Sequence, residues 1–210
     1  MLSLLTRQAA AAVRVLILLT LVLGVAYPLA VWGVSRIPGL HHRAEGSVLT
    51  VDGRPAGSSL IGIDPVPADP AADPFFHTRP SATAEDPLGI GPADPSVSGG
   101  SNKGGFSETL LGAVEQRRAL IAAREGVDAA RVPADAVTAS ASGLDPNISP
   151  AYAALQVPRV ARVTGLSEAD VARLVAQHTD GRPLGFLGEP GVNVPELNLA
   201  VHAAASMMRP

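Results

Sequence analysis

The sequence is 210 residues long, contains no cysteine and carries a formal net charge of −3 at pH 7. Without cysteine, disulfide frameworks, zinc sites with thiolate ligands and cysteine nucleophiles are all excluded. Lysine and arginine together number 16, and Lys103 is the single lysine, so the broad cationic surface that binds a phosphate backbone is missing. Length and composition predict one ordinary domain with an appendage.

A charge-free run from Val15 to Ser35 lies between Arg14 and Arg36. As an α-helix this run spans about 31 Å, which matches a bilayer hydrocarbon core of about 30 Å. We therefore predict a short N-terminus over residues 1–14 and a transmembrane helix over residues 15–37. The rings of Tyr27 and Trp32 favour the water interface, and Pro28 is expected to kink the helix locally. Residues assigned to the span include Val15, Leu19, Leu23, Tyr27, Pro28 and Trp32.

A cleaved signal peptide is the alternative interpretation of this segment. Arg7 and Arg14 resemble a basic n-region, and small residues precede Tyr27. The apolar run continues to Val34, which is longer than an ordinary signal-peptide core, and this favours a retained helix. Basic residues flank the run on both sides, so charge alone does not settle its orientation.

The remaining chain, residues 44–210, is predicted to form one α+β domain. Two short strands, residues 47–51 and 59–63, are expected around the turn Asp52-Gly53. Recurrent Asp-Pro pairs make residues 64–98 a long excursion that cannot sustain a helix. Capping and spacing signals then predict four helices and a strand. The helices run from Ser107 to Gly126, from Ser149 to Gly165 with a bend at Pro158, from Ser167 to no further than Gly181, and over residues 195–208, with the strand at residues 184–187.

The glycine cluster Gly99–Gly105 suggests a phosphate-binding loop, because successive amides and a lysine can hold an anion. The spacing does not fit, since a Walker loop starting at Gly99 would need lysine where Gly105 stands. A nucleophile elbow around Ser101 would need glycine at Lys103. A tight turn that leads into the Ser107 helix is the favoured interpretation.

Residues 137–146 alternate small apolar and hydroxyl side chains and end at Asp145-Pro146. Asp145 with Ser140 and Ser142 could line a site for a cation or an interface, although a strand that ends in a turn is the commoner meaning of this pattern. The five histidines lack ligand spacing on a shared helix face, so no metal site is predicted. The acidic residues of the excursion are expected to form a solvated face: Asp64, Asp69, Asp73, Glu85, Asp86 and Asp94.

No nucleophile is arranged with a base and an orienting group, so catalysis by this chain alone is not expected. The alternative function is a membrane-anchored binding module outside the cytoplasm, or a hydrolase, unrelated to ion transport.

The order of motifs along the chain nevertheless resembles one family, KdpC, the C subunits of the bacterial Kdp potassium-transporting P-type ATPases. The resemblance runs nearly end to end, and several motifs in the same order make it specific. The matching segments are the N-terminal hydrophobic helix with Tyr27-Pro28, Arg79–Ala82, Ser98–Asn102, Val137–Ser149, Gln156 with Arg159–Ala161, and Leu187–Val201.

The resemblance implies a single-pass protein of the bacterial inner (plasma) membrane, with residues 1–14 in the cytoplasm and the domain outside. It implies three partners: a channel-like potassium-translocating subunit, a P-type ATPase subunit and a small hydrophobic subunit. The implied role is assembly and stabilisation of an ATP-driven potassium importer, together with promotion of ATP binding by the catalytic subunit. The complex would use ATP, magnesium and potassium, and no cofactor is assigned to this chain.

By the same resemblance, seven polar residues near predicted turns are expected to organise the domain or to contact the channel-like subunit: Arg79, Ser101, Asn102, Asp145, Glu189, Asn193 and Glu196. The alternative is that they only satisfy backbone groups at turns. The chain departs from the family's pattern at Asn147, where histidine is usual, and at Gly191, where arginine is usual. Lys103 and Gly105 also replace an apolar residue and a proline, and the excursion is longer than typical.

Overall fold

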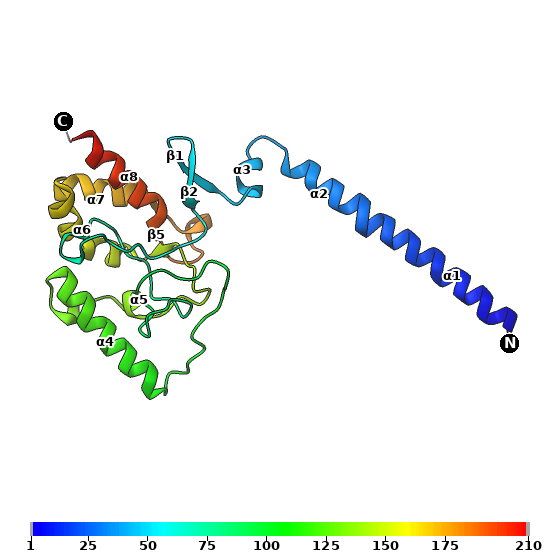
Figure 1. The fold of residues 1–210 in the computed structure, drawn as a ribbon, viewed down its shortest axis with the longest axis horizontal. Helices are drawn as coiled ribbons and strands as arrows, with labels where there is room; N and C mark the ends of the chain where they lie inside the picture. The colour runs from blue at the N-terminus through cyan, green and yellow to red at the C-terminus, as the bar shows by residue number, and fades with distance from the viewer. Residues whose placement is uncertain (1, 209–210) are drawn as a thin grey trace. The chain divides into compact units, whose positions relative to one another are not determined.

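The computed structural model describes residues 2–208, and the chain divides into two compact units, one ending at Val48 and the other beginning at Leu49. The first unit holds α1 (Leu2–Leu21), a π-helical turn (Val22–Ala26), α2 (Tyr27–Ser35) and the short α3 (His41–Ala44) (Figure 1). Within the described residues, one helix, Ser3–Ser35, is long and apolar enough to cross a membrane. The helix includes most of residues 1–14, and its uncharged part still begins after Arg14.

The helix accommodates Pro28 through the π-helical turn that precedes it. Proline has no N–H and its ring crowds the carbonyl four residues earlier, so the hydrogen-bond ladder must adjust nearby. The Tyr27 N–H donates to the Val22 carbonyl, one residue further back than in an α-helix. The irregularity expected at Pro28 is therefore one wide turn within a helix that continues to Ser35.

Two small antiparallel sheets lie in the second unit or at its start. The first pairs β1 (Val48–Val51) with β2 (Arg54–Ser58), and the second has the order β3-β5-β4. In that sheet β3 (Asn147–Ile148) and β4 (Thr179–Asp180) both pair with β5 (Gly191–Asn193), so that Val192 faces Ile148 on one side and Thr179 on the other.

Two strand predictions are wrong in position. The strand expected at residues 59–63 is Arg54–Ser58 instead, because Asp52 and Gly53 both adopt positive φ and return the chain at once in a two-residue turn. Residues 184–187 form no strand: a 3₁₀ turn, Pro183–Gly185, occupies this position, and Leu184 itself has a φ of 55°.

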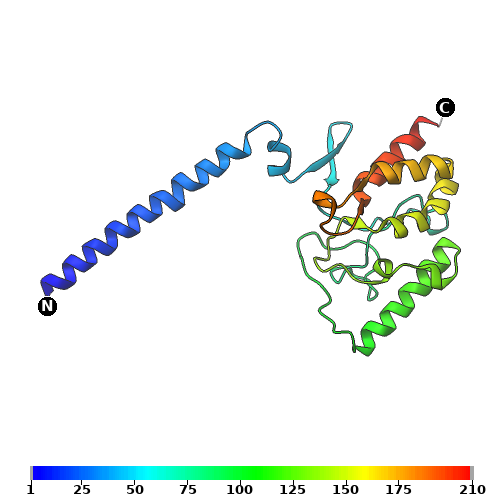
Figure 2. The same ribbon diagram turned by 180° about the vertical axis from the view of Figure 1, so that it is seen from behind.

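The four predicted helices are confirmed as α4 (Glu108–Glu125), α6 (Pro150–Thr164), α7 (Glu168–Gln177) and α8 (Val194–Met207). Each begins where a side chain accepts a hydrogen bond from the first turn, namely Ser107, Ser149, Ser167 and Asn193. α6 continues through Pro158, and it packs against α4, α7 and α8 (Figures 1 and 2). Short helical elements complete the domain: 3₁₀ turns at Pro70–Ala72 and Ala129–Arg131, and α5 (Ala134–Val137).

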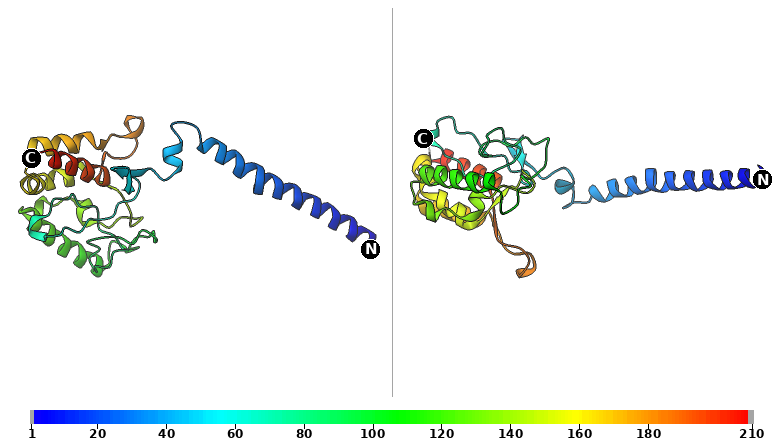
Figure 3. Two further views of the ribbon diagram at one scale, coloured as in Figure 1. Left: turned by 45° about the horizontal axis from the view of Figure 1, so that its top comes forward. Right: turned by 90° about the horizontal axis from the view of Figure 1, so that it is seen from below.

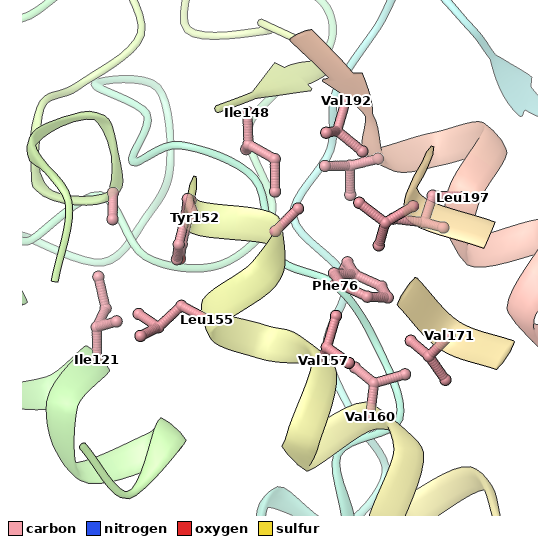
Figure 4. Close-up of a cluster of buried hydrophobic side chains, with 14 of the residues drawn as sticks. Phe76, Ile121, Ile148, Tyr152, Leu155, Val157, Val160, Val171, Val192 and Leu197 are labelled. Carbon is pink, nitrogen blue, oxygen red and sulfur yellow. The ribbon is translucent and has the colours of Figure 1, made fainter. Parts of the chain in front are cut away.

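The core lies around α6. Val157 and Val160 of this helix lie near Phe76, which comes from the Pro-rich excursion and is fully buried, and Tyr152 belongs to the same cluster further along the helix (Figure 4). Ile121 of α4, Val171 of α7, Leu197 of α8 and the sheet residues Ile148 and Val192 complete the cluster. Fully burying a side chain of this size contributes about 1.5–3 kcal/mol. The excursion is therefore part of the folded domain, anchored by its one core aromatic.

Candidate functional site

A loop of residues 138–146, here called the hub loop, joins four distant parts of the chain. The expected strand at its start is absent, because α5 occupies residues 134–137 and the serine hydroxyls then accept hydrogen bonds from nearby N–H groups, as from Gly143 to Ser140 at 2.9 Å. Its four backbone partners come from different segments: Ser140 N donates to Pro80 O (2.8 Å), Gly99 N to Ser142 O (2.8 Å), Gly62 N to Leu144 O (2.9 Å) and Val194 N to Pro146 O (2.9 Å).

Arg79 and Asp145 close the hub loop with a part-buried ion pair. Arg79 Nη1 lies 3.1 Å from Asp145 Oδ2, and the two side chains are 23% and 29% exposed. The guanidinium also donates to the carbonyls of Thr138 and Ala139, while Asp145 Oδ1 accepts the N–H of Asn147 at 3.0 Å. Two of the predicted site residues thus meet, and together they fix both ends of the loop.

Glycine is required where other segments approach this loop. A Cβ on Gly62 would stand 2.2 Å from the carbonyl oxygen of Asp145, and one on Gly100 would stand 2.9 Å from that of Ala141. Gly143 combines a φ of 76° with a position that would place its Cβ 2.8 Å from the Gly99 carbonyl. These contacts are backbone against backbone, so a side chain cannot be absorbed by a rotamer change.

The other predicted residues, as far as the structure describes them, form no hydrogen bond or ion pair with Arg79 or Asp145. Ser101 and Asn102 are exposed in the turn before α4, which closes where Ser107 N donates to Gly104 O, as predicted. Asn193 caps α8 through Glu196 N and donates to the Ser59 carbonyl. Glu189 is exposed and pairs with Arg182 across the loop between β4 and β5.

A buried charged cluster escaped the sequence interpretation. His77, for which the sequence predicts no metal-ligand role, lies with Nδ1 3.0 Å from Asp64 Oδ1 and Nε2 2.6 Å from Asp73 Oδ2. Asp64 and Asp73 were expected on a solvated face, yet their side chains are 8% and 3% exposed. The prediction is wrong for these two residues because the excursion folds inward at both of them.

The cluster continues into the helices. Arg159 of α6 lies 3.2 Å from Asp73 and donates to Glu125 of α4, which also accepts from Arg124 at 2.7 Å. Arg124 in turn donates to the Tyr152 hydroxyl at 3.0 Å, and burial raises the pKa of Tyr152 to about 12. Three parts of the chain, the excursion, α4 and α6, are thus joined by charge-assisted hydrogen bonds, which are roughly twice as strong as neutral ones.

Side-chain amides hold the excursion at the same place. Gln156 of α6 accepts the N–H of His77 at 2.8 Å and donates to its carbonyl, while Asn198 of α8 does the same for Phe76. Gln156 and Arg159 lie in one of the segments that carry the family resemblance, and this match is the sequence signal that could have pointed to the cluster. The acidic and histidine partners gave none, because they are scattered between residues 64 and 125. Among residues 2–208, no group of three or more His, Asp or Glu side chains is placed to hold a metal ion.

The comparison with known proteins concerns the whole chain. Residues 9–203 match the family described as KdpC, K+-transporting ATPase, c chain. The chain belongs to the KdpC family. It is 50% identical over 201 residues to a protein of Kineococcus radiotolerans named potassium-transporting ATPase KdpC subunit, with 96% of both chains covered. Proteins of the same name from Dechloromonas aromatica and Sorangium cellulosum are 46% and 48% identical, covering 92% of this chain and 96% of each relative.

Two positions at which the sequence is expected to depart from the family's pattern, Asn147 and Gly191, are neighbours in the structure. Asn147 on β3 and Gly191 on β5 lie on paired strands, and a Cβ at Gly191 would stand 3.2 Å from the Asn147 Cβ. Gly191 begins the strand that leads to the α8 cap at Asn193.

Proposed function

We propose that this chain is an accessory subunit of an ATP-driven, high-affinity potassium import complex and that it stabilises the assembled complex. The match to the KdpC family carries the proposal, because it extends over residues 9–203 and so includes both the apolar helix and the domain. The partners would be a channel-like potassium-translocating subunit, a P-type ATPase subunit and a small hydrophobic subunit. Catalysis would belong to the ATPase subunit, with this chain non-catalytic.

We propose the bacterial inner membrane as the location, with a single span, residues 1–14 in the cytoplasm and the domain of residues 44–210 outside. The uncharged stretch between Arg14 and Arg36 supports a span. In the described residues of this helix every side chain with an assigned burial, apart from half-buried Ser35, is exposed, as expected of a segment that lipid or another subunit covers.

The contact surface of the domain is proposed to include the loop of residues 182–189. Leu184 and Phe186 are 82% and 71% exposed, and the 3₁₀ turn holds them in place through a hydrogen bond from Leu187 N to Pro183 O. This loop extends away from the rest of the domain in the right-hand view of Figure 3. Exposed apolar side chains on a formed loop are typical of a protein interface. Ser101, Asn102 and Glu189 are the predicted residues with exposed side chains that suit contact, whereas Arg79, Asp145 and Asn193 organise the domain.

An effect on ATP binding is proposed to pass through the membrane helix. The domain has no Walker spacing around Lys103, and a domain outside the cytoplasm meets essentially no ATP. Coupling between distant sites needs an element that both sites bias, and the wide turn before Pro28 is a position where the helix can change its hydrogen bonding. The KM for ATP of complexes with Pro28→Ala should differ from that of the native complex, and an unchanged KM would contradict this route.

The test of the main proposal is affinity purification of the tagged full-length chain from detergent-solubilised membranes of its own host grown in low potassium. We expect recovery of a P-type ATPase and a channel-like subunit, with ATPase activity that potassium stimulates. The same membranes carrying the untagged chain are the control. A monodisperse chain recovered alone from intact membranes would overturn the proposal and favour a free-standing binding module.

A further inference from the structure

The imidazole of His77 is enclosed by acceptors on both sides. Each ring nitrogen faces a carboxylate oxygen, at 3.0 Å for Asp64 and at 2.6 Å for Asp73. An ionised carboxylate only accepts hydrogen bonds, and a neutral imidazole has one N–H donor, so two such bonds need the imidazolium form. The geometry of this buried triad therefore requires His77 to carry a proton on each ring nitrogen, which is one proton more than neutral histidine carries.

The charge balance of the cluster leads to the same requirement. Its anions are Asp64, Asp73 and Glu125, and its cations are Arg124, Arg159 and protonated His77. The six charges cancel only while His77 is protonated. Loss of that proton leaves one uncompensated negative charge among side chains of low exposure, and an unpaired buried charge is strongly destabilising.

The cluster holds a defined piece of the excursion. Residues 64–75, here called the latch segment, run between the two carboxylates and end next to Phe76. Asp64 also accepts the N–H groups of Thr78 and Gly91, and the Asp73 carbonyl accepts from Arg159 of α6. Phe76 is held separately, by its buried ring and by Asn198. Thr78, Gly91 and Arg159 keep these contacts when His77 is neutral, so losing the bonds to His77 loosens the latch segment between its two ends and leaves Phe76 in the core.

We propose that His77 is a proton-operated latch: protonated, it closes residues 64–75 onto α4 and α6, and its deprotonation at alkaline pH releases this segment while the helical core stays folded. A neutral imidazole keeps one donor, so one carboxylate would face a ring lone pair and that end of the segment would open. The device senses alkaline conditions on the side of the membrane where the domain lies.

The surroundings of His77 fix the direction of the response. Burial lowers the pKa of His77 and the charge of Arg124 on α4 lowers it further, but the hydrogen bonds to Asp64 and Asp73 outweigh both and raise it above its ordinary value. Arg159 of α6 acts through Asp73, and the Tyr152 hydroxyl lies beyond Arg124. A raised histidine pKa adds stability that is fully present below the ordinary value of about 6.5 and is lost as pH rises through the folded pKa.

The test uses the full-length chain in lipid nanodiscs. Hydrogen exchange of the latch segment, corrected for the intrinsic pH effect, is followed from pH 6 to pH 10, with α6 as an internal reference. We expect protection of residues 64–75 to fall at least about tenfold, which corresponds to about 1.4 kcal/mol in the free energy of local opening, while α6 stays protected. NMR of 13C-labelled histidine, with the His77 signal assigned by its loss in His77→Gln, should show titration above the ordinary value over the same range.

Variants separate charge from shape. His77→Gln removes the cation and should expose the latch segment already at pH 7, and Asp64→Asn combined with His77→Gln restores the charge balance and should recover protection. His178→Gln, at a half-buried histidine between α7 and β4, is the matched control and should leave the profile unchanged. The proposal is overturned if His77 titrates at or below its ordinary value, if the latch segment and α6 lose protection together, or if the pH profile is flat. The wild-type exchange profile decides where His77→Gln does not fold.

Discussion

Arg79 reaches across the sequence to Asp145 and, with the same guanidinium, binds the carbonyls at the opposite end of the hub loop. One nitrogen lies 3.1 Å from the carboxylate, and the others donate to Thr138 and Ala139 at 3.2–3.3 Å. Asp145 neutralises the charge of Arg79, and the two carbonyls fix the position of its guanidinium. The Arg79–Asp145 pair therefore sets the shape of the hub loop, whose backbone bonds Gly62, Pro80, Gly99 and Val194.

Replacing Asp145 with alanine should weaken recovery of the complex without abolishing membrane insertion. The guanidinium of Arg79 would lose its counter-charge and the hub loop its closure, at a cost of about 1–3 kcal/mol in the free energy of unfolding. Pull-down yield and membrane fractionation measure the two effects separately. Glu115→Ala, at an exposed position of α4, is the control and should change neither. Unchanged recovery with Asp145→Ala would count against a role in assembly.

Gly62→Ala should destabilise the domain by about 1–3 kcal/mol, as overpacking does elsewhere. The new Cβ would meet the Asp145 carbonyl at 2.2 Å, and backbone on both sides leaves no side chain to move away. Gly112→Ala, in α4 with nothing within 4 Å of its Cβ, is the matched control and should instead stabilise by about 0.5–1 kcal/mol. Urea unfolding followed by circular dichroism compares the two, and equal effects would refute the close approach at Gly62.

The parts of the fold that sequence predicted are those with local signals. The serine caps at 107, 149 and 167 and the glycines after α4 and α6 marked helix ends correctly, because capping depends on neighbouring residues alone. The charge-free run likewise marked the apolar helix. The turn at Asp52-Gly53 was predicted, but the strand after it was displaced in the prediction because residues 54–58 include Pro55 and Gly57, which disfavour a strand assignment.

The site was predictable only where a motif reached it. Arg79 and Asp145 are both among the site residues predicted from the motifs. Their contact, however, depends on how the hub loop folds back, and hydrogen bonds from distant segments determine that fold. The prediction is wrong for Asp64 and Asp73, since an acidic, proline-rich stretch resembles a solvated loop until its partners are known. Their charged partner from the helices is Arg159 of α6, which pairs with Asp73 and also with Glu125 of α4, and no periodicity in the sequence relates these residues.

The free energy of unfolding should fall on the acid side as well. Burial raises the pKa of Asp64 and of Asp73, but hydrogen bonds and the charge of His77 outweigh it and lower both below their ordinary value of 3.8. Lowered carboxyl pKa values add stability that is present above the ordinary value and is lost as pH falls through the folded values. Denaturant unfolding between pH 2 and 6 measures this loss. Asp64→Asn should flatten the slope, and an unaltered slope would remove Asp64 from the explanation.

The loop of residues 182–189 provides the sharpest distinction between folding and assembly. Replacing Leu184 and Phe186 together with serine should leave the free energy of unfolding within about 0.5 kcal/mol, because exposed positions contribute little to the folded state. Recovery of the complex should nevertheless fall at least about tenfold, since truncating an apolar anchor at an interface costs about 2 kcal/mol or more. Leu120→Ser, at a residue of α4 that is 51% exposed, is the control for a general loss of surface apolarity. Equal recovery of the complex from all three proteins would show that this loop contacts no other subunit, whereas a loss confined to the double variant would place the interface at the tip of the turn.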